Sequence, residues 1–162
     1  MRKPMAAVLL IAASCAHAQD AAFTVRMMTV DTALQAARAA LENCRKSGYQ
    51  VAVAVVDRSG VTQVLLRDRF AGPHTVDMAA DKAWTAVSFR TSTAALADAT
   101  EPGKPLSGIR QRPRVAAVGG GLVIEGAGAM LGGIGVSGAP GGERDEACAR
   151  AGIAAVQGQL DF

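Results

Sequence analysis

The sequence predicts an α+β fold, with an antiparallel sheet flanked by helices in a single domain. Two β-rich hairpins carry this prediction. Residues 49–56 (YQVAVAVV) and 61–67 (VTQVLLR) form the first around a turn at residues 57–60, and apolar runs within residues 122–136 form the second. Strands joined by hairpins pair antiparallel, whereas parallel strands need crossover helices. Because helical segments precede, separate and follow the hairpins, the order of elements favours α+β.

The first expected helix lies between residues 29 and 48. Thr29 or Asp31 can cap its start, and Gly48 is well placed to end it. Its apolar residues recur at steps of three and four, which gives the helix one face to bury. That face comprises Val30, Ala33, Leu34, Ala37, Leu41 and Cys44.

A second helix is expected over residues 75–89, after a turn at Gly72 and Pro73. Gly72 permits unusual backbone angles, Pro73 fixes its own, and Thr75 can cap the helix. Small residues on one face would let this helix pack closely on a sheet or on another helix. His74 lies between the turn and the helix, so its imidazole is a candidate metal ligand, although a solvated turn residue would show the same pattern.

The segment 119–142 is rich in glycine, with eleven glycines in twenty-four positions. The apolar runs between them indicate a hairpin rather than a linker, with glycines at bends or where another backbone approaches closely. Residues 133–138 match G-x-G-x-x-G, but a dinucleotide fold needs that motif in a turn after the first strand. Here it lies largely inside a strand, so we reject nucleotide binding. Helices at 92–99 and 143–157 complete the expected order.

Residues 101–114 are expected to form a polar loop that carries Arg110, Arg112 and Arg114. Alternating arginines can meet anionic ligand groups, and Arg112 is our candidate for that role. A solvated loop or an oligomer contact is the alternative. The sequence holds no phosphate-binding loop, nucleophile elbow or tetrahedral zinc set. Binding is therefore favoured over hydrolytic or metal catalysis.

Residues 1–18 are typical of a signal peptide, with two basic residues, a short apolar core and small residues before a cleavage site after Ala18. We therefore expect a periplasmic or secreted protein, in which residues 19–28 lead into a domain at 29–162. The mature chain has no apolar stretch long enough to span a bilayer.

Cys15 raises the alternative of a lipoprotein, because the residues before it loosely resemble a lipobox. Cys44 and Cys148 can form a disulfide in an oxidising compartment, or they can be buried free thiols. The chain has 17 Lys and Arg against 14 Asp and Glu, and only 4% aromatic residues. Without a concentrated basic face or stacking residues, nucleic acid is not an expected partner.

Two segments resemble the GlcG/HbpS-type haem-binding family, in which haem-degrading domains are also placed. The first is Gly72-Pro73-His74-Thr75 followed by ADKAWTA at residues 80–86, and the second is LGGIGVSG at residues 131–138. The resemblance extends over nearly all of residues 29–157 in the same order of elements. It implies a profilin-like fold that assembles into homo-oligomers, possibly octamers, and that associates with haem.

Carried onto this chain, the resemblance makes His74 the candidate iron ligand. Thr75 would ligate weakly or anchor a propionate, and the open backbone at Gly72 would let a flat macrocycle approach. Lys82 would pair with a carboxylate or reach the ligand, although a solvated or structural lysine is the more usual interpretation. Alternative axial sulfur ligands are Met27, Met28 and Met130, although a methionine in such a pattern is more often core packing.

The leading hypothesis is therefore an exported haem-binding protein, which holds iron porphyrin for storage, transport or redox sensing. The first alternative is an enzyme that degrades haem and releases iron, for which the sequence supplies no separate catalytic group. The second is a binding or sensor module for another small anionic ligand.

Overall fold

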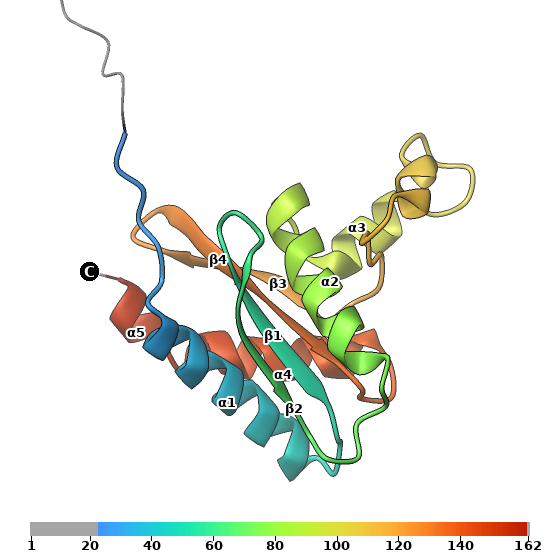
Figure 1. Cartoon of the computed structure of the whole chain (residues 1–162). Helices are drawn as coiled ribbons and strands as arrows, with labels where there is room; N and C mark the ends of the chain where they lie inside the picture. The colour runs from blue at the N-terminus through green and yellow to red at the C-terminus, as the bar shows by residue number, and fades with distance from the viewer. Residues whose placement is uncertain (1–22, 162) are drawn as a thin grey trace, which may run out of the picture.

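The computed structural model describes residues 23–161, so the expected signal peptide, Cys15 and the first part of the lead-in lie outside the described residues. It has a four-stranded antiparallel sheet with the strand order β2-β1-β4-β3. Helices α1 and α4 cover one face of the sheet, and α2 with α3 beside it covers the other (Figure 1). The elements are α1 Val30–Lys46, β1 Ala52–Asp57, β2 Thr62–Arg67, α2 Thr75–Phe89, α3 Thr93–Ala99, a 3₁₀ helix η1 Ser107–Gln111, β3 Gly121–Gly126, β4 Ala129–Ser137, α4 Gly142–Ala154 and α5 Gln157–Leu160.

This architecture confirms the predicted α+β fold and both hairpins. The side chain of Thr29 caps α1 by accepting a hydrogen bond from the Thr32 N–H at 3.2 Å. Two boundaries differ from the prediction by more than one residue. The first strand begins at Ala52 rather than at residue 49, and the expected last helix breaks after Ala154 into α4 and the short α5. The polar loop also holds the 3₁₀ helix η1, which the sequence did not indicate.

The larger core lies between the sheet and the α1–α4 layer. Alternate residues of β1 point into it, and they meet the alanine-rich face of α1 and the apolar residues of β4. The fully buried members include Val53, Val55, Ala36, Ala40 and Ile134. Because this face of α1 is built from alanines, the helix axis can approach the sheet and α4 closely.

A disulfide between Cys44 on α1 and Cys148 on α4 crosses this core. The sequence left open whether these cysteines pair, and the structure shows that they do. The two residues are 104 positions apart, and both are almost completely buried. The bond therefore ties the first helix to the last one on the same face of the sheet.

The opposite face carries α2, which lies directly on glycines of β3 and β4. A side chain at Gly135 would overlap the backbone carbonyl of Ala79, and a Cβ atom at Gly133 would lie 2.9 Å from the carbonyl oxygen of Ala83. We call these contacts, together with that of Gly121 against the Lys82 backbone, the glycine seam. This confirms the expectation that the glycines mark close backbone approach.

The strand register brings the start of β1 and the ends of β2 and β4 to one end of the sheet. Ala52, the first residue of β1, pairs with Arg67 at the end of β2 and with Ser137 at the end of β4. α2 begins shortly after β2 ends, and α4 begins shortly after β4 ends. The starts of α2 and α4 therefore face each other across the end of the sheet.

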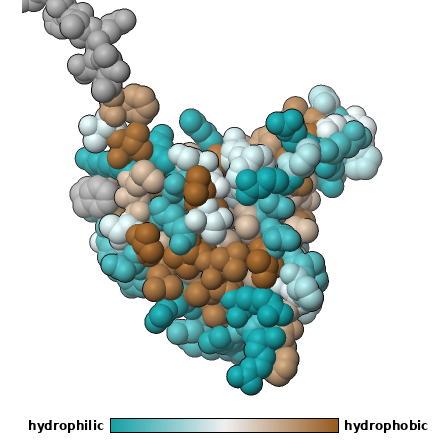
Figure 2. Space-filling model, in the orientation of Figure 1, coloured by the Kyte–Doolittle hydropathy of each residue, from teal (hydrophilic) through white to brown (hydrophobic). Residues whose placement is uncertain are grey.

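On the side shown in Figure 2, apolar residues gather over β1 and β2, between α1 and α2. Leu65 of β2 and Val61 just before it are among the exposed apolar residues. Larger patches of this kind often mark association surfaces. The oligomer expected from the resemblance stays a prediction. Within residues 23–161, no helix is long and apolar enough to cross a membrane.

The disulfide should contribute strongly to stability. Replacing both cysteines (Cys44→Ala with Cys148→Ala) should lower the free energy of unfolding by about 2–5 kcal/mol, because the bond closes a long loop in the unfolded chain. Urea denaturation followed by circular dichroism measures this loss. The wild-type protein unfolded in the presence of a reductant should have the same free energy of unfolding as the double variant. If the double variant were within about 0.5 kcal/mol of the oxidised wild-type protein, the assignment of the disulfide would be contradicted.

The glycine seam should not tolerate a methyl group. Gly135→Ala should cost about 1–3 kcal/mol or more, since α2 must move away from β4 to make room for the new Cβ atom. Gly158→Ala in α5 is the matched control, because no atom lies within 4 Å of a Cβ there. Equal urea midpoints for the two variants would show that α2 does not rest on the strand as described.

Candidate functional site

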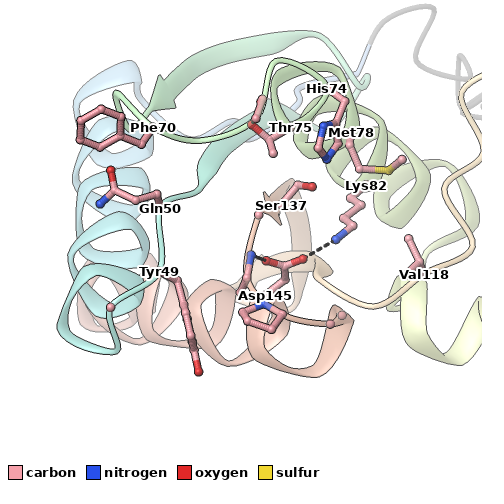
Figure 3. Close-up of a pocket in the computed structure, with 17 residues that line it drawn as sticks. Tyr49, Gln50, Phe70, His74, Thr75, Met78, Lys82, Val118, Ser137 and Asp145 are labelled. Carbon is pink, nitrogen blue, oxygen red and sulfur yellow. Dashed lines mark hydrogen bonds and ion pairs between the residues drawn. The ribbon is translucent and has the colours of Figure 1, made fainter.

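A cavity of about 620 Å³ opens at the end of the sheet where α2 and α4 begin. Its walls come from the first half of α2, the end of β4, the loop that leads into α4, and the turn after α1 (Figure 3). Pockets for small molecules and cofactors typically have volumes of roughly 300–1,000 Å³. The cavity is therefore large enough for a ligand of cofactor size.

One face of α2 supplies the cavity wall. His74, Met78 and Lys82 follow one another at four-residue steps, so their side chains lie on the same side of the helix. All three line the cavity (Figure 3). Met78 was missed in the sequence, although its four-residue spacing from His74 was a signal that could have found it. The wall thus carries an imidazole, a thioether and an ammonium group in that order.

The turn before α2 shapes the position of the imidazole. Gly72 does not have a positive φ angle, so the expectation that it serves an unusual backbone conformation is wrong. Its missing side chain matters instead, because a Cβ atom there would lie 2.8 Å from Cε1 and 2.9 Å from Nδ1 of His74. Gly72 therefore leaves room for the ring of His74, which is exposed at the mouth of the cavity.

Thr75 has a different role from the predicted cap. His74 occupies the N-cap position and makes no side-chain capping bond. The hydroxyl of Thr75 donates to the carbonyl oxygen of Gly72 at 2.7 Å, and the residue is 1% exposed. The Thr75 hydroxyl proton therefore closes the turn, and the oxygen atom keeps its acceptor capacity.

A buried ion pair forms the floor of the cavity. Nζ of Lys82 lies 2.7 Å from Oδ2 of Asp145, and their side chains are only 3% and 5% exposed. Lys82 also donates to the carbonyl oxygen of Val136 at 2.9 Å, and the other Asp145 oxygen accepts from the N–H of Ala139 at 2.9 Å. Burial raises the pKa of Asp145 above its ordinary value, and the hydrogen bond and charge of Lys82 oppose this rise.

Gly120 makes the ion pair sterically possible. A Cβ atom at this position would lie 2.7 Å from Cβ of Asp145 and 2.9 Å from Nζ of Lys82. Gly120 also has a φ angle of 116°, a conformation that residues with side chains rarely adopt. The pair thus joins α2 to α4 only because the chain between them has no side chain here.

Apolar side chains stand at the mouth of the cavity. Phe70, which precedes the turn, is 78% exposed, and Val118 on the opposite side is 42% exposed. Together with Met78 they give the entrance a partly apolar rim (Figure 3). A ligand with a large flat apolar body would cover these three side chains, while its polar groups could reach the ion pair below.

The structure brings only some of the predicted site residues to this cavity. Gly72, His74, Thr75 and Lys82 line it, whereas Arg112 is exposed on the polar loop and does not. Met27, Met28 and Met130 also lie outside its lining, and Met28 packs in the main core. Within the described part of the chain, no group of three or more His, Cys, Asp or Glu side chains could hold a metal ion.

The other two arginines of the loop stabilise the fold. Arg110 donates to the carbonyl oxygens of Thr100 at 2.7 Å and Ala97 at 2.6 Å. Arg114 pairs with Asp81 at 3.0 Å and lies 4.8 Å from the centre of the Trp84 ring. These contacts hold the loop against α2 and α3.

Comparison with known proteins connects this geometry to haem. A sequence profile described as haem-degrading protein HbpS-like matches residues 28–154. The crystal structure of a double mutant of HbpS from Streptomyces reticuli has a TM-score of 0.78 and 39% identity, and the match covers 93% of this chain and 97% of that one. A crystal structure of a PduOC–haem complex has a TM-score of 0.74 and 33% identity, over 80% of this chain and 94% of that one.

Curated proteins give a consistent but partial match. The corrinoid adenosyltransferase PduO of Salmonella typhimurium is 36% identical over 124 residues, which is 75% of this chain and 37% of PduO. PduO of Citrobacter freundii matches over the same shares with 35% identity. The chain therefore spans little more than a third of the length of these relatives. An uncharacterised 15.0 kDa protein of Citrobacter freundii is 31% identical over 116 residues and is covered over 82% of its length.

Neutralising one partner of the buried ion pair should strongly lower the stability of the protein. Asp145→Asn should lower the free energy of unfolding by about 3–5 kcal/mol, because it leaves the Lys82 ammonium buried without a counter-charge. The double variant Lys82→Met with Asp145→Asn should be less destabilised than the single one, since no buried charge remains. Urea denaturation of the wild-type protein, Lys82→Met, Asp145→Asn and the double variant measures the free energy of unfolding of each.

The Arg114–Asp81 pair provides the matched control. Its side chains are 47% and 32% exposed, so Asp81→Asn should cost only about 0–1 kcal/mol. If Asp145→Asn cost no more than Asp81→Asn, the pair at the cavity floor would not be the buried interaction described above.

Proposed function

Because this chain belongs to the family of HbpS-like haem-degrading proteins, we propose that it binds haem in the cavity between the starts of α2 and α4. The observation that carries the proposal is the position of His74, whose imidazole stands at the mouth of this cavity within a fold shared with a haem complex. When bound, haem would supply the iron-centred chemistry, and the chain would hold and orient it.

The residues of the cavity fit such a ligand. A neutral imidazole is a common protein ligand of haem iron, and a thioether is another. His74 and Met78 present these two groups on the same helix face. The exposed apolar rim of Phe70, Met78 and Val118 would contact the macrocycle and so lose its exposure to water.

We further propose that the protein acts outside the cytoplasm, in storage, transport or redox sensing. The signal-peptide pattern of residues 1–18 supports export. The disulfide between Cys44 and Cys148 also supports it, since such bonds persist mainly in oxidising compartments. The adenosyltransferase activity named for PduO belongs to much longer proteins, and we do not propose it for this chain.

The description of the family as haem-degrading supports a second candidate function, in which the chain breaks down haem and releases iron. Incubating the haem-loaded protein with a reductant and oxygen distinguishes the two functions. A Soret band that decays in the presence of catalase, and that persists in a His74→Ala variant loaded with the same haem, would indicate degradation at this site. A stable band in the wild-type protein supports binding alone.

Replacing the candidate ligand should change the haem spectrum. Titrating the untagged protein with haemin should give a shifted, saturable Soret band, and His74→Ala should move that band and weaken binding at least about tenfold. Changes in residues that only support a metal ligand already cost roughly 10–100-fold in affinity, so loss of the ligand itself should cost no less.

Met27→Ala is the matched control, because this alternative axial ligand is exposed and lies outside the lining of the cavity. It should leave the spectrum unchanged. An unchanged spectrum in His74→Ala would exclude this imidazole as the ligand, and a wild-type protein that fails to bind haemin at all would refute the proposed function.

A further inference from the structure

The floor of the cavity contains a hydroxyl group without a partner. Ser137 is the last residue of β4, is 5% exposed and lines the cavity (Figure 3). Among the described residues, none forms a hydrogen bond with its side chain. The hydroxyl oxygen is not one of the fully buried side-chain atoms that lack a partner, so it is open to the cavity, where a ligand or a water molecule can take up its hydrogen bond.

Lys82 leaves a second donor at the same place. An ammonium group has three N–H donors, and the bonds of Lys82 to Asp145 and Val136 use two of them. Within residues 23–161 no further hydrogen-bond partner of Nζ is present. Both carboxylate oxygens of Asp145, by contrast, already accept hydrogen bonds. The ammonium group therefore keeps one N–H donor for which the described residues provide no acceptor within hydrogen-bond distance.

The start of α4 adds backbone donors. Gly141 is the N-cap of this thirteen-residue helix and provides no side-chain cap, and both Gly141 and Gly142 line the cavity. The first N–H groups of a helix have no partner inside it, and they lie at the positive end of the helix dipole. Helix starts of this kind favour anionic oxygen atoms.

From these three features we propose that the cavity floor is a carboxylate-binding subsite formed by Ser137, Lys82 and the N-terminus of α4. Lys82 and Asp145 neutralise each other, so the subsite attracts an anion through its unpaired donors and the helix dipole rather than through a net charge. His74 and Tyr49 are the other titratable residues that line the cavity, and His74 lies at its mouth. The ligand of this subsite is a propionate group of haem, and this identification rests on the proposed function.

The proposed anion site lies at the start of α4 rather than at the start of α2. The resemblance pointed to Thr75 as the propionate anchor, but the hydroxyl proton of Thr75 already serves the carbonyl of Gly72. At the start of α4 the N–H group of Gly141 donates to Ala139 and that of Arg144 to Gly141, whereas those of Gly142 and Glu143 have no partner among the described residues. Ser137 lines the same cavity as this helix start.

Comparing haemin with haemin dimethyl ester tests the subsite. The ester keeps iron and macrocycle but lacks both carboxylates. Wild-type protein should bind haemin roughly tenfold more tightly than the ester, as expected for charge-assisted hydrogen bonds, and Ser137→Ala should lose most of this preference. Ser88→Ala, a matched change at an exposed position on α2, should keep the preference. Equal binding of acid and ester by the wild type would overturn the subsite while leaving haem binding intact.

An experiment without porphyrin distinguishes a failure of the subsite from a failure of the proposed haem function. In ¹⁵N-labelled protein, sodium propionate should shift the amide signals of Ser137, Gly141 and Gly142 in the wild type, and it should shift them much less in Ser137→Ala. If neither porphyrin binds but these shifts occur, the proposed haem function fails and the subsite stands for a free small carboxylate. If no porphyrin binds and propionate shifts none of these signals, the subsite is wrong as well.

Discussion

The close contact between α2 and the glycines of β3 and β4 is the constraint on which the rest of the structure depends. Gly121, Gly133 and Gly135 let the backbone of α2 rest directly on the backbone of the strands. No side chain could fill this space without moving the helix away. The helix is therefore held at a fixed height over the sheet, and the face that carries His74, Met78 and Lys82 points past the end of β4.

That placement brings the Lys82 ammonium within reach of α4. A lysine with 3% of its side chain exposed needs a counter-charge, and Asp145 provides it at 2.7 Å. The pair joins the helix on one face of the sheet to a helix on the other face, around the end of β4. The cavity above it exists because Gly138, Gly141 and Gly142 leave this junction without large side chains. Packing and candidate function thus share the same residues.

Local patterns predicted the elements better than their roles. The hairpins, the short helix α3 and the span of α2 followed from periodicity and turn residues, which act over a few positions. The roles of Gly72 and Thr75 were misjudged, because the choice between a strained glycine and a sterically necessary one depends on where the ring of His74 folds back. Arg112 lies outside the cavity, which the sequence could not show for a similar reason. Nothing in the local sequence distinguishes a loop arginine that faces a ligand from one that stabilises the loop or faces solvent.

By itself the sequence determined the fold class, the order of elements, the close-packed glycine strands and the presence of a histidine at the start of α2. These follow from interactions between near neighbours in the chain. Only the tertiary structure decided that Cys44 bonds to Cys148, that Lys82 pairs with Asp145, and that Ser137 faces a cavity without a partner. The residues of each pair are 104 and 63 positions apart. Such contacts depend on how the helices sit on the two faces of the sheet, which no local pattern records.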